Sequence, residues 1–183
     1  MAEAATSQFW QSGCEHYKRH CRIMAPCCNN VYPCHVCHDE SEDHALIRTS
    51  ISKLLCIACN TLQDAKKQCD SCRASFGKYA CLLCFIFDDY WKGQFHCDKC
   101  GLCRVGGQNN YFHCTECNMC LARTLMDNHK CVTDCAAGNC PVCAENLHTT
   151  RKTLHVLPCG HILHSQCYEA VKNEQESCTV CEV

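Results

Sequence analysis

Residues 140–181 read CPVCAENLHTTRKTLHVLPCGHILHSQCYEAVKNEQESCTVC, and their spacing decides the fold of this end of the chain. Eight cysteines and histidines follow the order Cys-x2-Cys, Cys-x-His-x2-His-x2-Cys and Cys-x2-Cys. A Cys-x2-Cys knuckle supplies two sulfurs that can reach one tetrahedral zinc ion. The central run is too short to surround one ion, so its members are expected to alternate between two ions. We therefore predict two zinc ions in this segment.

This pattern resembles the RING family, in the variety with two adjacent histidines, at all eight ligand positions. The resemblance implies a cross-brace, in which alternating pairs of ligands share an ion. One set would be Cys140, Cys143, His164 and Cys167, and the other would be Cys159, His161, Cys178 and Cys181. The alternative interpretation is a two-zinc domain without a ubiquitin partner, such as a degenerate RING.

Two regular elements are expected within these residues. A helix is predicted over Ser165–Asn173, with Ser165 as its N-cap, because apolar side chains and a cysteine recur at helical spacing. The segment Thr153–Leu157 has the pattern of a short strand.

A RING has no catalytic side chain. By this resemblance the domain docks a ubiquitin-conjugating enzyme charged with ubiquitin, and it catalyses transfer by positioning the thioester. The implied docking residues are Val142, Leu157, Val171, Thr179 and Val180. Packing inside the domain explains the valines equally well, and Leu157 is the weakest candidate. Thr179 stands where proline is common in the family, and Glu182 stands where a basic residue is common, so a weaker ligase is expected.

A second resemblance lies near the start of the chain, where Cys14-x-His16-Tyr17 carries the letters of the CHY-type zinc finger. Two knuckles nine residues apart predict one self-contained site, formed by Cys56, Cys59, Cys69 and Cys72. The remaining candidates are assigned to two ions as a hypothesis: Cys14, His16, Cys34 and Cys37 on one, and Cys27, Cys28, His38 and His44 on the other. His20, Cys21 and His35 compete for these roles and are interpreted as spare surface residues.

The middle of the chain contains an internal repeat, in which the pattern His-Cys-x2-Cys-x2-Cys begins at His96 and recurs at His113. With the preceding knuckle and a following His-x-Cys, this segment offers twelve ligands, which suit three ions. A consistent arrangement is Cys81, Cys84, Cys97 and Cys100; then His96, Cys103, Cys114 and Cys117; then His113, Cys120, His129 and Cys131. Each ion would clip two turns together into a short rod of interlocked turns. The spacing resembles the CTCHY-type zinc finger.

The high cysteine content favours small units stabilised by bound metal over one domain with a large hydrophobic core. The chain has 26 cysteines and 12 histidines among 183 residues, and small units with thin cores need staples. The N-terminus lacks the basic start and apolar run of a secretory signal, so reduced thiols in the nucleus and cytoplasm are expected. The ligands named above suit about eight zinc ions at four per ion. They leave over Cys21, Cys135, His20, His35, His148 and His155.

Charge and hydropathy exclude two classes of partner. The formal net charge is −2 and no segment is basic, so we expect no nucleic-acid binding. No apolar run approaches the length of about 18 residues that a membrane-spanning helix needs, so we expect no membrane insertion.

These observations predict a small, metal-stapled multi-domain protein. Its parts are an N-terminal tail at 1–13, a CHY module at 14–72, a CTCHY module at 81–135 and a RING at 140–181. The first two modules should be irregular and organised by about three zinc ions each. The cross-brace RING should hold about two ions and contain one short helix and short strands.

The order CHY, CTCHY, RING resembles the RING and CHY zinc-finger ubiquitin ligases. The resemblance implies a RING-type ligase whose CHY/CTCHY half recruits protein substrates, transcription regulators among them. Family members continue into a further zinc-ribbon domain, so this chain is expected to be a short or truncated form. The alternative is a non-catalytic zinc-finger adaptor that binds partners without ligase activity. Metal storage is disfavoured, because storage chains cluster their cysteines without long intervening sequence.

Overall fold

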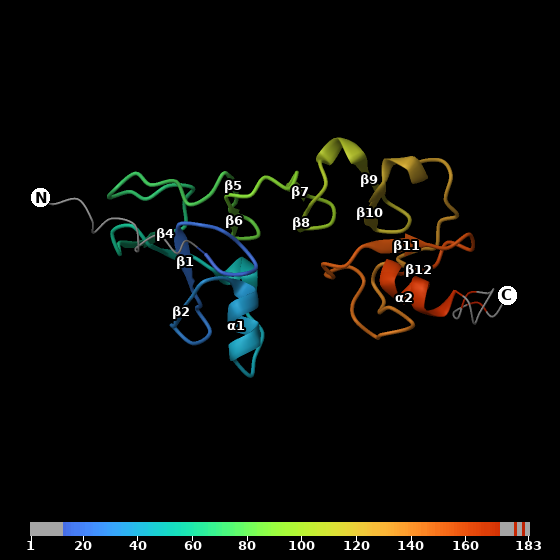
Figure 1. Ribbon diagram of the computed structural model, residues 1–183, viewed down its shortest axis with the longest axis horizontal. Coiled ribbons are helices and arrows are strands. Elements are labelled where there is room, and N and C mark those ends of the chain that lie inside the picture. Colours follow the sequence, from blue (N-terminus) through green and yellow to red (C-terminus); the bar gives the residue numbers. More distant parts are fainter. Residues whose placement is uncertain (1–12, 173–177, 179–180, 182–183) are drawn as a thin grey trace, which may run out of the picture. The chain divides into compact units, whose positions relative to one another are not determined.

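The computed structural model describes residues 13–172, 178 and 181 (Figure 1). The chain divides into two compact units between Gln94 and Phe95. Each unit has its own cluster of buried apolar side chains, so each is described by itself. Within the described ranges, no helix is long and apolar enough to cross a membrane.

An antiparallel sheet in the order β2-β1-β3-β4 organises the first unit. Ile23 of β1 lies opposite Leu54 of β3, and both side chains are fully buried. The neighbouring Arg22 is exposed, as the alternation of side chains along a strand requires. The elements of this unit are β1 (Cys21–Met24), β2 (Val31–Tyr32), α1 (His35–Ser41), η1 (Arg48–Ser50), β3 (Lys53–Cys56), β4 (Leu62–Asp64), β5 (Tyr79–Cys81) and β6 (Ile86–Asp88).

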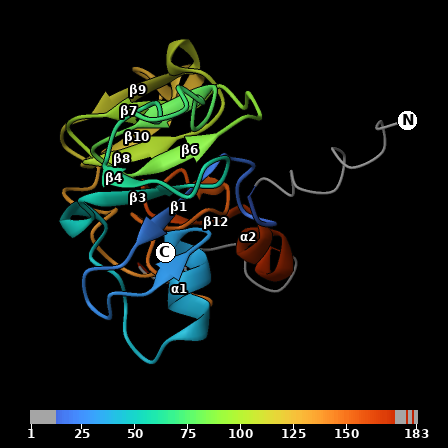
Figure 2. The same ribbon diagram turned by 90° about the vertical axis from the view of Figure 1, so that its left-hand side faces the viewer.

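Helix α1 begins at a cysteine that the sequence predicts to be a metal ligand. Cys34 is the N-cap residue, with an extended backbone, and its Sγ accepts a hydrogen bond from the N–H of Cys37 at 3.3 Å. A sulfur in this place satisfies one of the free N–H groups of the first helical turn. The helix lies beside β2 in both views (Figure 1, Figure 2). One side chain thus starts the helix and also faces a candidate metal group.

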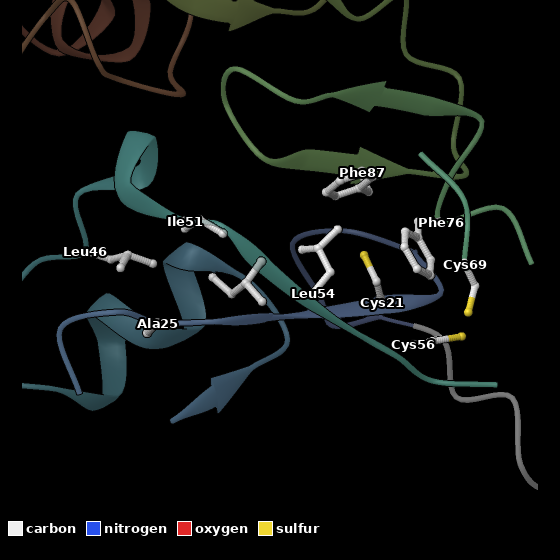
Figure 3. Close-up of a cluster of buried hydrophobic side chains, with 10 residues drawn as sticks. Cys21, Ala25, Leu46, Ile51, Leu54, Cys56, Cys69, Phe76 and Phe87 are labelled. Atoms are coloured by element: carbon white, nitrogen blue, oxygen red, sulfur yellow. The ribbon is translucent and has the colours of Figure 1, made fainter. Parts of the chain in front are cut away.

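The core of the first unit contains cysteines as well as hydrocarbon side chains (Figure 3). The rings of Phe76 and Phe87 meet edge to face with their centroids 6.1 Å apart. Figure 3 shows Cys56 and Cys69 close together at one end of this cluster. The buried residues are Cys21, Ile23, Ala25, Leu46, Ile51, Leu54, Cys56, Cys69, Phe76 and Phe87. Because the core is small and part of it is cysteine, hydrophobic burial alone stabilises this unit weakly.

The hairpin of β5 and β6 belongs to the first unit. Phe87 packs in its core, and the buried carboxylate of Asp88 accepts a hydrogen bond from the N–H of Lys18 at 3.3 Å. The predicted start of the second module, residue 81, falls within this hairpin. The first compact unit extends to Gln94, because apolar residues on both sides of the knuckle pack into the first core.

The second unit consists of two-stranded hairpins and one helix. Its elements are β7 (Phe95–Cys97), β8 (Leu102–Arg104), η2 (Gln108–Asn110), β9 (Tyr111–Cys114), β10 (Met119–Ala122), η3 (Arg123–Leu125), β11 (Leu154–Val156), β12 (Ile162–His164) and α2 (Ser165–Val171). Strand β7 pairs with β8, β9 with β10, and β11 with β12. Met119 and Leu121 of β10 share a buried cluster with Ile162 and Leu163 of β12, so the predicted RING segment and the hairpin before it form one core.

The predicted strand and helix near the C-terminus are both present. The strand is β11, which pairs with β12, and the helix α2 starts at the predicted residue. The N-cap is His164 rather than Ser165, and its side chain makes no capping hydrogen bond. The reason is that the Ser165 N–H donates to Thr153 O at 2.8 Å, while the His164 ring faces a metal group. The predicted end at Asn173 lies outside the described residues.

Candidate metal centres

Three groups of four ligand side chains lie in the first unit. Within each group the ligand atoms are all within 4.8 Å of one another. The groups are Cys14, His16, Cys34 and Cys37; Cys27, Cys28, His38 and His44; and Cys56, Cys59, Cys69 and Cys72. The structure thus brings together the same three sets that the sequence grouped.

The spacing inside these groups fits zinc. Zinc binds thiolate sulfur at about 2.3 Å and imidazole nitrogen at about 2.0–2.1 Å, so tetrahedral ligand atoms lie about 3.4–3.8 Å apart. The Sγ atoms of Cys56 and Cys72 are 3.6 Å apart, and His16 Nδ1 lies 3.5 Å from Cys37 Sγ. These separations exceed the disulfide bond length of about 2.05 Å. A donor set of thiolates and imidazoles also suits zinc better than magnesium or calcium.

Six of the Cys-x2-Cys knuckles end in the same kind of turn. The residue after the second cysteine has a left-handed backbone in each: Asn60, Arg73, Phe85, Gly101, Asn118 and Ala144, with φ between 51° and 65°. In four of them the N–H of this residue donates to the carbonyl of the first cysteine, as in Asn60 N to Cys56 O at 2.9 Å and Ala144 N to Cys140 O at 2.8 Å. This conformation costs a residue with a side chain about 1–2 kcal/mol. The turn is therefore a strained one, which metal ligation by the two cysteines can hold in place.

Carboxylates orient the histidines of one group. His38 presents Nε2 to Cys27 Sγ at 3.2 Å, and its Nδ1 lies 2.9 Å from Asp39 Oδ1. Asp43 Oδ1 lies 3.0 Å from His44 Nδ1, and His44 Nε2 is buried with no hydrogen-bond partner among the described residues. A carboxylate on one ring nitrogen leaves the other free to bind metal. Neither aspartate was predicted, although each adjoins a candidate histidine in the sequence.

One complete group lies across the repeat in the second unit. It consists of Cys97, Cys100, His113 and Cys120. Cys100 Sγ lies 3.2 Å from His113 Nδ1 and 3.5 Å from Cys120 Sγ. Hydrogen bonding, chiefly from Cys120, outweighs the effect of burial and lowers the pKa of Cys100 to about 4. The thiolate form that binds zinc is therefore favoured at this position.

The predicted grouping of this repeat is wrong in one respect. The sequence joined the Cys97 and Cys100 knuckle to Cys81 and Cys84, and it joined His113 to later ligands. One predicted pair is confirmed: His113 shares a metal group with Cys120, the third cysteine of its repeat. The two residues lie opposite each other across strands β9 and β10. That pair combines with the preceding knuckle instead of the following ligands.

The remaining ligands of this segment form a cluster and two pairs. Cys114 Sγ lies 3.7 Å from Cys131 Sγ, which in turn is 3.3 Å from His129 Nε2. The N–H of Cys117 donates to Cys114 Sγ at 3.5 Å, which places both knuckle cysteines at this cluster. In the first unit the N–H of Cys84 donates to Cys81 Sγ at 3.4 Å, and in the second unit His96 Nδ1 lies 3.8 Å from Cys103 Sγ. Each pair supplies two of the four ligands that a tetrahedral site takes.

The segment 140–181 has the interleaved contacts of a cross-brace. His164 Nδ1 lies 3.3 Å from Cys143 Sγ and 3.8 Å from Cys167 Sγ. His161 Nδ1 lies 3.5 Å from Cys159 Sγ and 3.6 Å from Cys178 Sγ. Cys140 shares a knuckle with Cys143, and hydrogen bonding with Cys178, burial and hydrogen bonding with Cys159 raise the pKa of Cys181 to about 11. The first and third ligand pairs therefore meet at one centre, and the second and fourth pairs meet at the other.

A hydroxyl holds the buried histidine of this cross-brace. His164 is fully buried, and its Nε2 lies 3.1 Å from Thr150 Oγ1. The Thr150 hydroxyl also donates to Glu145 Oε1 at 2.9 Å, and the side chain of Lys152 pairs with Glu145. This chain of contacts fixes the ring with Nδ1 toward the thiolates. Sequence analysis did not identify Thr150, which shows no motif that marks it.

Of the five predicted docking residues, the structure describes three. Val142 lies on the first knuckle and is 39% exposed. Val171 ends helix α2 and is half-buried, whereas Leu157 packs against the core of the second unit, which agrees with its being the weakest docking candidate. Thr179 and Val180 lie outside the described residues, as does Glu182.

The cysteines and histidines left over have structural contacts. Cys21 is fully buried in the first core, so its interpretation as a surface residue is wrong; it faces inward because β1 alternates. His20 Nε2 pairs with Asp89 Oδ2 at 2.7 Å, and the ring of His35 lies 5.9 Å from that of Tyr17. In the second unit, Cys135 packs against the core, His148 Nε2 lies 3.0 Å from Cys100 O, and His155 stacks on Tyr168 at 3.9 Å.

The serial thiolate–imidazole groups and the cross-brace define the class: a zinc-organised protein of short strands and few helices that contains a RING. Residues 14–79 match the CHY zinc finger family, and residues 138–182 match the Ring finger domain family. Both matches fall on segments whose ligand geometry is described above.

Relatives that match most of this chain extend the assignment. The chain is 45% identical over 175 residues to E3 ubiquitin-protein ligase SRFP1 of Oryza sativa subsp. japonica. The matched region covers 93% of this chain and 67% of that protein. It is 41% identical over 180 residues to E3 ubiquitin-protein ligase RZFP34 of Arabidopsis thaliana, covering 92% and 62%. Zinc finger protein BRUTUS of Arabidopsis thaliana is 40% identical over 174 residues, covering 92% of this chain and only 14% of that protein. The chain belongs to the family of RING-type E3 ubiquitin ligases that carry a CHY zinc finger.

Proposed function

We propose that this protein promotes ubiquitination of protein substrates by docking a charged ubiquitin-conjugating enzyme on its RING. The CHY/CTCHY half recruits the substrates, and the protein works in the nucleus and cytoplasm. The observation that carries this proposal is the interleaved contact pattern of the RING ligands, with an exposed apolar side chain, Val142, on the first knuckle.

The cross-brace explains how such a surface stays rigid. Cys143 lies on the knuckle and Cys167 on α2, and both contact His164 Nδ1. The elements that carry Val142 and Val171 are therefore held by the same centre. A rigid apolar surface suits catalysis by positioning, in which the ligase only orients a thioester that another enzyme carries.

The family assignment shows that this protein binds zinc. We propose a count of about eight ions per chain, with four ligands for each ion. Elemental analysis of the purified, reduced protein should therefore give about eight zinc ions per chain. A folded protein that holds only about two ions would contradict the assignment of the first 135 residues.

Removing part of the Val142 side chain should weaken transfer without disturbing zinc. Val142→Ala removes about two methyl groups, which corresponds to roughly 1–2 kcal/mol of buried contact with the partner. Ubiquitin transfer in an autoubiquitination assay should fall several-fold to tens-fold, since about 1.4 kcal/mol is a factor of ten. Val105→Ala is the matched control, because Val105 is also an exposed valine of the second unit but lies outside the RING. It should leave transfer unchanged.

A second variant tests the opposite direction, by restoring the residues that are usual in the family at positions 179 and 182. The double variant Thr179→Pro, Glu182→Arg should raise transfer above wild type with a panel of conjugating enzymes. If wild type and the double variant both show no transfer with any of these enzymes, the ligase proposal fails. The alternative of a non-catalytic adaptor then accounts for the family fold.

A further inference from the structure

The loop that follows strand β6 is fixed by one buried carboxylate. Asp88, the last residue of β6, is 1% exposed, and its Oδ1 accepts a hydrogen bond from the Tyr90 N–H at 3.1 Å. Its Oδ2 accepts from Lys92 Nζ at 2.8 Å and from Gln94 Nε2 at 3.2 Å. The Gln94 side chain also accepts from the Lys92 N–H at 2.8 Å and donates to Tyr90 O at 2.6 Å. The shape of residues 90–94 is therefore set by charge-assisted contacts inside the first unit.

This loop presents two neighbouring aromatic side chains to solvent. Tyr90 is 59% exposed and Trp91 is 72% exposed. The Trp91 side chain makes no hydrogen bond or ring contact with any residue that the structure describes, so it contributes little to its own unit. Tryptophan and tyrosine are the side chains that most often dominate binding at protein interfaces. Because the loop is already ordered, it loses little conformational entropy when a partner binds.

Exposed lysines lie beside the aromatic pair. Lys18 O accepts a hydrogen bond from the Asp89 N–H at 2.7 Å, and the Lys78 N–H donates to Asp89 Oδ1 at 3.2 Å. Asp89 directs its other oxygen to His20 Nε2, at 2.7 Å. Lys18, Lys78 and Lys92 are all exposed, and the first two form no ion pair within the described ranges. The solvent-facing charge around this loop is therefore positive.

We propose that Tyr90 and Trp91, together with Lys18, Lys78 and Lys92, form a docking surface for an acidic peptide segment of a substrate protein. An aromatic or aliphatic side chain of that segment covers the two rings, and its flanking carboxylates pair with the ammonium groups. The inference rests on the proposed function, in which the CHY/CTCHY half recruits substrates, and it names the kind of segment that is recruited.

A single-stranded nucleic acid is the other kind of partner that aromatic and lysine side chains can bind. Binding to a phosphate backbone depends on many clustered basic residues. The chain has a formal net charge of −2 and no basic segment, so three lysines favour a short run of carboxylates over a nucleic acid.

The test measures the affinity of the zinc-loaded full chain for a short fluorescein-labelled peptide in which Glu alternates with Phe and Leu. Fluorescence anisotropy is the readout. Trp91→Ala should weaken binding about 30-fold or more, as expected for a central hot-spot side chain. Ile47→Ala is the matched control, because Ile47 is 71% exposed in the same unit, and it should leave the affinity unchanged. The double variant Lys18→Glu, Lys78→Glu should weaken binding at least about tenfold, whereas Lys53→Glu, on β3, should not.

Peptide binding requires no ubiquitin transfer, so the two proposals fail separately. A wild-type protein that binds the peptide through Trp91 but shows no autoubiquitination supports this surface and removes only the ligase proposal. Absence of peptide binding by wild type, or wild-type affinity in Trp91→Ala, overturns the docking surface even when the ligase is active. Tighter binding of a labelled oligouridine, or of the same peptide with Lys in place of Glu, also overturns it.

Discussion

A strong zinc chelator should unfold both units of this protein. Structural zinc contributes about 10–16 kcal/mol per site in small finger peptides near neutral pH. A whole domain is typically stable by only about 5–15 kcal/mol, so removal of even one ion per unit exceeds the available margin. In the first unit, Cys56 and Cys69 are both core residues and metal-group members, so this core depends directly on the metal.

The knuckle turns add to this dependence. Arg73, Phe85 and Ala144 hold left-handed backbones that their side chains disfavour, and metal-free cysteines would no longer fix them. Circular dichroism and NMR chemical-shift dispersion should report unfolding as chelator is added, and zinc should restore the signals under reducing conditions. Chelator saturated with zinc beforehand is the control. Native chemical-shift dispersion that persists after complete zinc removal would show that hydrophobic burial alone stabilises the fold.

His164→Ala should abolish ubiquitin transfer and release one zinc ion. The side chain is fully buried, and its Nδ1 lies within 3.8 Å of both Cys143 and Cys167. Its removal leaves three thiolates around a cavity and separates the knuckle from α2. Because transfer depends on the relative placement of those two elements, activity should fall at least about 100-fold, equivalent to roughly 2.7 kcal/mol or more.

Two variants distinguish ligand loss from general damage. His164→Cys keeps four metal ligands and should recover zinc binding and part of the activity. His155→Ala removes a histidine that stacks on Tyr168 and belongs to no predicted ligand set. It should keep its zinc content and most of its transfer activity. If His164→Ala retains full zinc content and wild-type transfer, His164 is not a ligand and the cross-brace assignment fails.

Much of this protein follows from ligand spacing. A Cys-x2-Cys knuckle makes a local turn, so its two sulfurs point the same way whatever surrounds them. That local rule was enough to predict the group of Cys56, Cys59, Cys69 and Cys72, whereas the RING pairing was implied by the family resemblance and the other two groups of the first unit were a hypothesis. The apolar pattern of residues 153–157 and the helical spacing after Ser165 were enough to predict β11 and α2. Helix α2 starts at the predicted residue, but its N-cap is His164 rather than Ser165, whose backbone N–H makes a tertiary hydrogen bond.

Tertiary structure alone decided how the repeated ligands combine. In the repeat, His113 and Cys120 are fixed as a pair by strand register, but the sequence spacing permits that pair to join the knuckle before it or the ligands after it. Packing of successive hairpins selects the preceding knuckle. The burial of Cys21 is likewise decided by the core it faces. Local chemistry specifies what can bind a metal, whereas which ligands share an ion depends on distances between segments that only the folded chain sets.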